Sequence, residues 1–209
     1  FRMKTIKRVQ VNNKAGMTFA AALRSILRAD PDVVLIGEIR DQETANIAIE
    51  ASLTGHLVLS TLHTNDAPSA VTRLTEMGVE PFLLSSSLAA VMAQRLARRL
   101  CKKCKRQDTA TEAELRTLGV PHMPDTPLPT IWRPVGCREC ANTGYSGRVA
   151  IQQVMGVDST MEDLIARGAT SIDIDKAAKE QGMTTLRKDG WQKALQGITS
   201  VEEVLRVTV

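Results

Sequence analysis

The stretch "DPDVVLIGEIRD", residues 30–41, decides the fold, because it reads as a buried strand that ends in charge. Pro31 ends the apolar helical pattern of residues 17–29, since proline lacks an N–H and disfavours helix in the residue before it. Residues 33–37 form a continuous, β-branched-rich apolar run. Such a run is typical of a parallel strand, and we expect it to be buried on both faces.

The segments that follow alternate between helical and strand patterns. Asp41 can cap a helix that Gly55 ends, and "HLVLSTLH", residues 56–63, is the next strand. Two further helices are expected at about 67–77 and 81–100. Because parallel neighbours require crossover connections, this order with short connections predicts an α/β fold with a parallel sheet wrapped by helices.

The character of the chain changes after residue 100. Residues 101–140 contain all four cysteines and five of the eight prolines. Beyond them, a strand "GRVAIQQVM" leads into expected helices near 159–167, 171–181, 184–196 and 200–207. We therefore predict three parts: an α/β core over 1–100, a cysteine-rich insert over 101–146 and a mostly helical subdomain over 147–209.

Composition and charge narrow the class of protein. The chain is 43% apolar, which is ordinary for a globular protein, and it has neither an apolar run of about 18 residues nor a basic-then-apolar leader. These features predict a cytosolic location. The chain opens on Phe1, in a strand-like segment "FRMKTIKRVQV", so we interpret it as a piece of a longer protein.

The four cysteines predict a metal site. Cys101 and Cys104 form one C-x-x-C pair, and Cys137 and Cys140 form a second. Two such pairs can close a tetrahedron of thiolates around Zn²⁺ with no open position, which indicates a structural ion rather than a catalytic one. A disulfide reading suits a reducing cytosol poorly, and a redox motif would need only one pair.

Two polar side chains follow neighbouring strands. Glu38 comes directly after the first strand, and His63 ends the second. Ligands bind at the carboxyl ends of strands in open α/β sheets, where a carboxylate can hold Mg²⁺ or its water and an imidazole can donate to a phosphate oxygen. The plainer alternative is a salt bridge between Glu38 and Arg40 or another nearby base. His56, at the beginning of its strand, is expected at the far end of the sheet.

These residues nevertheless lack a phosphate loop. G-x-x-x-x-G-K-[ST] is the usual phosphate-binding loop, and no Gly-Lys pair occurs in the chain. The sequence therefore predicts half of a nucleotide site at most.

Together, the stretches "MTFAAALRSILRADPDVVLIGEIRDQETANIAIEASLTGHLVLSTLHTNDA", "RLARRLCKKCK" and "CRECANTGYSGR" resemble the C-terminal part of the secretion ATPase superfamily. The branch they are most similar to is that of the type II secretion and type IV pilus assembly ATPases (GspE/PilB-like). The resemblance covers essentially the whole chain, and the insert with two C-x-x-C pairs argues against the pilus-retraction branch.

The resemblance implies a RecA-like ATPase core, with "VVLIGE" as Walker B strand and "TGHLVLSTLH" as His box. Glu38 would then bind Mg²⁺, and His63, with His56, would contact the γ-phosphate of ATP. The Walker A and Asp-box motifs would lie upstream of Phe1. The sequences around Arg73 and Arg95 also resemble the family, which makes both arginines candidates for contacts with nucleotide or a neighbouring subunit. The alternative is that they form ordinary salt bridges on helix surfaces.

For the whole protein, the resemblance implies a homo-hexameric motor, peripheral at the inner membrane. ATP hydrolysis would act on an inner-membrane platform protein, with a cytoplasmic docking protein as a further partner, to drive pilus assembly or type II secretion. The alternative is a non-enzymatic zinc module that binds nucleic acid through the basic run 95–106, which holds seven cations and no acid. That run lacks the aromatic residues that stack on bases, so no nucleic acid is expected.

Overall fold

A computed structural model describes residues 6–208 and divides the chain into two compact units. The first holds the described residues up to Ala89 together with Val157–Asp175, and the second holds Ala90–Gly156 together with Lys176 and the residues after it. The three parts predicted from the sequence have other bounds than these two units, and that division into parts stays a prediction. No helix among the described residues is both long enough and apolar enough to cross a membrane.

A small parallel sheet lies at the centre of the first unit. Strand β1 pairs with β2 in register from Val33 opposite Leu57 to Ile36 opposite Ser60. Helix α2 connects the two strands, as a parallel crossover requires. The elements of this unit are η1 (Asn13–Ala15), α1 (Phe19–Leu27), β1 (Val33–Ile36), α2 (Gln42–Leu53), β2 (Leu57–Ser60), α3 (Pro68–Glu76), α4 (Pro81–Ser87) and α6 (Ser159–Ala166).

The signals that bound α2 act as predicted. Asp41 accepts a hydrogen bond from the backbone N–H of Thr44 at 2.8 Å, which caps the first turn. Gly55 follows the last turn with a φ of 101°, a conformation that glycine adopts without steric cost. The predicted parallel α/β arrangement and its crossover helix are confirmed.

The prediction that β1 is buried on both faces is wrong. Val34 and Ile36 are buried, whereas Val33 and Leu35 are 54% and 74% exposed. Side chains alternate between the two faces of a strand, and in the part of this unit that the structure describes only one face of the two-stranded sheet is covered. The apolar run therefore identifies the strand correctly but overstates its burial.

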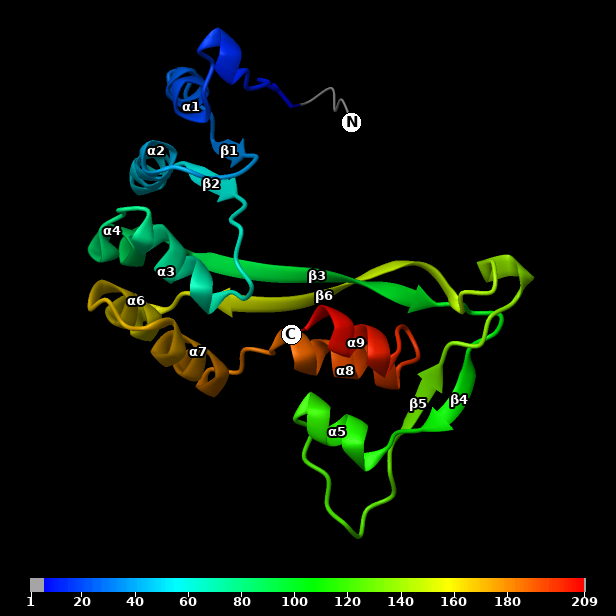
Figure 1. Cartoon of the computed structure of the whole chain (residues 1–209). Helices are drawn as coiled ribbons and strands as arrows, with labels where there is room; N and C mark the ends of the chain where they lie inside the picture. The colour runs from blue at the N-terminus through cyan, green and yellow to red at the C-terminus, as the bar shows by residue number, and fades with distance from the viewer. Residues whose placement is uncertain (1–5, 209) are drawn as a thin grey trace. The chain divides into compact units, whose positions relative to one another are not determined.

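A long antiparallel ribbon organises the second unit (Figure 1). β3 and β6 pair from Ala90 opposite Gly156 to Leu100 opposite Tyr145, with an irregularity between Arg98 and Leu100. Helices α8 and α9 pack along this ribbon, and the β4–β5 hairpin and α5 belong to the same unit. The bounds are β3 (Ala90–Leu100), β4 (Arg106–Thr109), α5 (Glu112–Leu118), β5 (Thr130–Arg133), η2 (Arg138–Cys140), β6 (Tyr145–Gly156), α8 (Leu186–Leu195) and α9 (Val201–Val207).

One predicted helix is wrong over most of its length. The pattern of residues 81–100 predicts a single helix, but α4 ends at Ser87 and residues 90–100 form β3. Alanine, methionine, glutamine, arginine and leucine all favour helix locally. Long-range pairing with β6 overrides this preference, because the ribbon buries alternate residues such as Ala93 and Ala97.

The remaining helices and the strand of residues 147–155 are confirmed within a few residues at each end. Helix α7 (Ser171–Glu180) carries the chain from the first unit into the second. The expected strand in "FRMKTIKRVQV" falls partly on residues 1–5, which lie outside the described residues. Residues 6–11 adopt no strand.

Candidate functional site

Glu38 and His63 meet at the carboxyl edge of the parallel sheet. Glu38 lies two residues beyond β1, and His63 lies three residues beyond β2. The carboxylate Oε2 of Glu38 is 3.2 Å from Nε2 of His63. Parallel strands bring their carboxyl ends to one edge, which is why two residues 25 positions apart in the chain become neighbours.

Hydrogen bonds between the two segments continue past the ends of the strands. The N–H of Ile39 donates to the carbonyl of Thr61 at 3.1 Å. The hydroxyl of Thr61 donates to the carbonyl of Gly37 at 2.6 Å. These contacts tie the segment that carries Glu38 to the segment that carries His63, so the pair rests on an extension of the sheet.

Arg40 also contacts Glu38. Its Nε lies 2.7 Å from Oε2, the same oxygen that faces His63. The hydrogen bond from Arg40 lowers the pKa of Glu38; desolvation opposes this shift, and His63 adds to it. The salt bridge considered as the plainer alternative therefore forms together with the His63 contact, and Glu38 is a carboxylate at neutral pH.

The chemistry of this pair suits a metal–phosphate ligand. A carboxylate oxygen is a hard ligand of the kind that Mg²⁺ prefers, and Mg²⁺ usually keeps several waters while binding one or two carboxylates and substrate phosphates. The His63 side chain is 84% exposed, so its ring can reach a ligand outside the protein surface. Glu38 could hold Mg²⁺ or its water, and His63 could donate to a phosphate oxygen.

The other predicted nucleotide residues contact residues near them in sequence. His56 precedes β2, at the opposite end of that strand from His63, and its Nδ1 lies 3.1 Å from the carbonyl of Ala51. Arg73 donates to Glu76 one helical turn away at 3.4 Å. Arg95 lies in β3, where its guanidinium donates to the carbonyl of Gln94 at 3.0 Å. Their roles stay predictions.

The four cysteines form a compact cluster. Their sulfur atoms all lie within 4.8 Å of one another. The Sγ–Sγ distances are 3.9 Å for Cys101 and Cys137, 3.8 Å for Cys104 and Cys140, and 3.7 Å for Cys137 and Cys140. A tetrahedron with Zn–S bonds of about 2.3 Å has edges of about 3.8 Å. The cluster thus has the size that a tetrahedral Zn²⁺ site requires, and all four cysteines are free thiols.

The local environment shifts the pKa values of two of these thiols in opposite directions. Burial raises the pKa of Cys104 to about 11. Burial acts in the same direction on Cys140, but the N–H groups of Cys137 and Gly144 donate to its sulfur and lower its pKa to about 6. N–H donors favour the thiolate, which is the form that binds metal.

Part of the basic run serves packing within the second unit. The guanidinium of Arg98 donates to Glu203 at 2.6 Å and lies over the ring of Tyr145. Lys105 donates to the carbonyl of Gly197 at 2.7 Å and lies over the ring of Trp132. These two cations are engaged within the fold.

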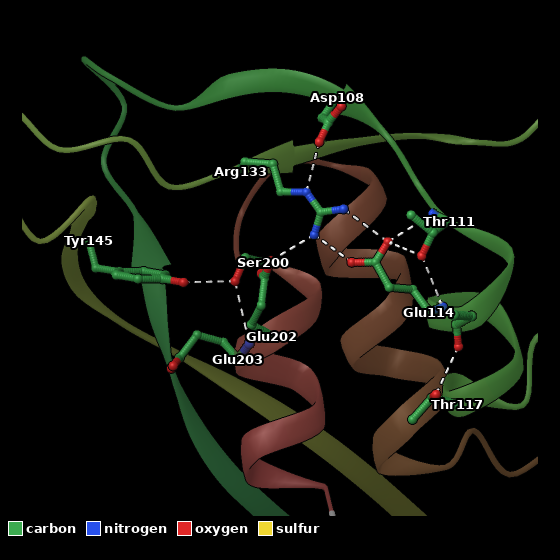
Figure 2. A network of polar contacts seen from close by, with 10 residues as sticks. Asp108, Thr111, Glu114, Thr117, Arg133, Tyr145, Ser200, Glu202 and Glu203 are labelled. Atoms are coloured by element: carbon green, nitrogen blue, oxygen red, sulfur yellow. Dashed lines mark hydrogen bonds and ion pairs between the residues drawn. The ribbon is translucent and has the colours of Figure 1, made fainter.

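Figure 2 shows a network of polar contacts around Arg133. The sequence-based predictions do not include it. Arg133, at the end of β5, binds Asp108 of β4, Glu114 of α5 and Glu202 of α9, with N–O distances of 2.9, 2.5 and 2.7 Å. The Arg133 side chain is only 19% exposed. Its partners lie 19 to 69 residues away in sequence, so no local sequence pattern predicts these contacts. Arg133 ties the cysteine-rich insert to the last helix.

Three comparisons place the chain among known proteins. A family model described as "Type II/IV secretion system protein" matches residues 1–206. Type II secretion system protein E of Pseudomonas aeruginosa is 53% identical over 208 residues, which cover 100% of this chain and 41% of that protein. Type IV pilus assembly ATPase PilB of Thermus thermophilus is 49% identical over 209 residues, which cover 100% of this chain and 23% of that protein. The chain thus spans less than half the length of these curated relatives.

Solved structures agree at the level of fold. The pilus retraction motor PilT with bound ADP has a TM-score of 0.62 at 24% identity, over 91% of this chain and 43% of that one. The ATPase DotB of Legionella pneumophila has a TM-score of 0.60 at 22% identity, over 91% of this chain and 42% of that one. At this level of identity the likeness concerns the fold alone, and it confirms the predicted α/β fold class.

Proposed function

Because the chain belongs to the type II/IV secretion system protein family, whose named members include type IV pilus assembly ATPases, we propose that it supplies the Walker B and His-box part of an ATP-hydrolysis site. The observation that carries the proposal is the 3.2 Å approach of Glu38 to His63 at the carboxyl edge of a parallel sheet. We infer that the whole protein is a motor that drives type II secretion or type IV pilus assembly.

In this proposal each residue has a defined task. Glu38 holds Mg²⁺ through one carboxylate oxygen or through a bound water, and His63 donates to the γ-phosphate. Mg²⁺ held by Glu38 would supply positive charge that offsets the negative charge developing on the phosphates during transfer. His56, Arg73 and Arg95 are assigned to the same nucleotide site or to a subunit boundary by family resemblance alone.

The phosphates themselves need a further element. The 209 residues contain no G-x-x-x-x-G-K-[ST] motif, so the loop that cradles the phosphates must come from elsewhere in the protein. We therefore propose that this chain binds nucleotide weakly by itself. A longer form that includes the upstream loop should bind Mg·ATP and hydrolyse it.

The cysteine cluster has a structural task. We propose that Cys101, Cys104, Cys137 and Cys140 bind one Zn²⁺ as thiolates, with no position left for substrate. The ion would join the segment after β3 to the segment before β6, and so hold the insert 101–146 to the end of the ribbon.

The whole protein is proposed to act as a homo-hexamer. Its partners would be an inner-membrane platform protein and a cytoplasmic docking protein, and it would be cytoplasmic and held peripherally at the inner membrane by them. The family match and the names of the relatives support a secretion or pilus-assembly ATPase. The hexamer, the two partners and the place at the membrane rest on the family resemblance alone.

The test compares two forms of the protein by calorimetric titration with Mg·ATP. The 209-residue chain should show little binding, and a form extended upstream through a phosphate loop should bind. In the extended form Glu38→Gln should abolish turnover while ATP still binds. Turnover at the parent rate in that variant would overturn the role given to Glu38, and tight binding by the 209-residue chain would overturn the account of the phosphate loop.

A further inference from the structure

The two oxygens of Glu38 have different surroundings. Oε2 receives both Arg40 Nε, at 2.7 Å, and His63 Nε2, at 3.2 Å. Among residues 6–208, the hydrogen bond that His63 forms with the Glu38 side chain reaches Oε2, and no hydrogen bond reaches Oε1. Oε2 is therefore contacted by two side chains, whereas Oε1 keeps its hydrogen-bonding capacity for a ligand.

The backbone accounts for the place of Arg40. Ile39 is buried, and its N–H bonds to the strand extension at Thr61, while the residues on either side of it are not buried. Successive side chains in such a segment point to opposite sides, so Glu38 and Arg40 share a side. Asp41 anchors the other end of the segment by capping α2. The backbone on both sides of Arg40 is thus anchored, at Ile39 and at Asp41, which places Arg40 beside Glu38.

The contact between Arg40 and Glu38 differs from an ordinary surface salt bridge. A typical surface salt bridge joins two mobile side chains and contributes little to stability. Here the Glu38 side chain is 23% exposed, and the oxygen that Arg40 holds is the one that His63 also contacts. Arg40 therefore fixes the rotation of a carboxylate that has a second partner.

We propose that Arg40 is a positioning residue of the site: it holds Oε2 of Glu38 against His63 and so leaves Oε1 free for the magnesium ion or for a water. The identity of the ligand at Oε1 rests on the proposed function. The contacts among Arg40, Glu38 and His63 are those of the chain itself. Arg40 touches neither nucleotide nor reacting atoms in this role. It acts through Glu38.

The first experiment needs no nucleotide and uses the 209-residue chain. Imidazole ¹⁵N NMR would follow the rings of its three histidines. Arg40→Gln frees the carboxylate, so the His63 signals should move, and Glu38→Gln should move them as well. The ring of His56 contacts Ala51 and that of His122 contacts Thr126, so both serve as internal standards.

Two further variants sharpen this measurement. Arg40→Lys should keep the His63 signals near their parent positions, because an ammonium can also form an ion pair with Oε2 of Glu38. Arg28→Gln, an exposed arginine in the same unit, is the matched control and should change nothing. Unchanged His63 signals in Arg40→Gln would overturn the inference.

The second experiment uses the extended, ATP-hydrolysing form. Arg40→Gln should lower kcat by about tenfold or more, because a misplaced catalytic group costs rate rather than binding. The calorimetric Kd for Mg·ATP should stay within about twofold, and Arg40→Lys should restore most of kcat. Equal kcat in parent and Arg40→Gln would overturn the inference.

The two proposals fail in different ways. If Glu38→Gln hydrolyses ATP at the parent rate, the proposed function of Glu38 fails even though Arg40→Gln moves the His63 signals. If Glu38→Gln is inactive and Arg40→Gln is fully active, only the positioning role of Arg40 fails.

Discussion

Replacing Glu203 with glutamine should destabilise the second unit more than any other single carboxylate change in it. The Glu203 side chain is 1% exposed, yet it is charged. It accepts hydrogen bonds from the backbone N–H and guanidinium of Arg98, at 2.8 and 2.6 Å, and from the guanidinium of Arg206, at 2.8 and 2.7 Å. Helix α9, which carries Glu203, is thereby fixed to β3.

The magnitude follows from the pKa of Glu203. Burial by itself would raise this pKa, but the hydrogen bonds from Arg206 and Arg98 outweigh it and lower the pKa from 4.5 to about 2. Each pKa unit corresponds to about 1.4 kcal/mol, so the charge contributes about 3 kcal/mol to the free energy of unfolding at pH 7. Glutamine still accepts one hydrogen bond, and the half-exposed arginines return to water. We expect a loss of about 2 to 3 kcal/mol.

Tryptophan fluorescence during urea unfolding measures this loss selectively. Both tryptophans of the chain, Trp132 and Trp191, belong to the second unit. The matched control is Glu180→Gln, an exposed glutamate at the end of α7 in the same unit, which should change the free energy of unfolding by less than about 0.5 kcal/mol.

The pH dependence provides the decisive comparison. The folded pKa of Glu203 lies below its unfolded value, so its contribution is complete above about pH 4.5 and is lost as the pH falls toward 2. The stability difference between parent and Glu203→Gln should therefore shrink below pH 4.5 and fall to less than about half by pH 3. A difference that is constant with pH, or no larger than that of Glu180→Gln, would refute the reasoning.

Three other substitutions test packing and the cysteine cluster. Arg133→Met should cost about 2 kcal/mol, because it leaves the carboxylate of Glu114 without its main partner, and Arg133→Lys should cost less; thermal unfolding followed by circular dichroism checks both. Gly190→Ala should cost about 1 to 3 kcal/mol, since a Cβ there would lie 2.6 Å from a methyl of Val204, whereas Gly156→Ala meets nothing within 4 Å; equal Tm values for the two would contradict this packing. Cys101→Ser should abolish zinc binding and loosen the insert; a metal assay that finds no zinc in the parent protein would disprove it.

Much of the fold could be predicted because its signals are local. Pro31, Asp41 and Gly55 mark helix ends through their own backbone and side-chain chemistry. Cysteines three residues apart can bind one ion from a single turn, whatever surrounds them. Parallel strands place their carboxyl ends together, so the sequence alone indicated that Glu38 and His63 lie at the same edge.

Other features were decided only when distant segments met. Residues 90–100 form a strand because β6 pairs with them, although their own preference is helical. The second face of β1 stays exposed because, among the described residues of its unit, nothing covers it. The charge of Glu203 is stabilised by two arginines, one of them 105 positions away, and the partners of Arg133 come from three different elements. Local sequence sets which conformations are available to each segment, and the free energy of burial and long-range pairing selects among them.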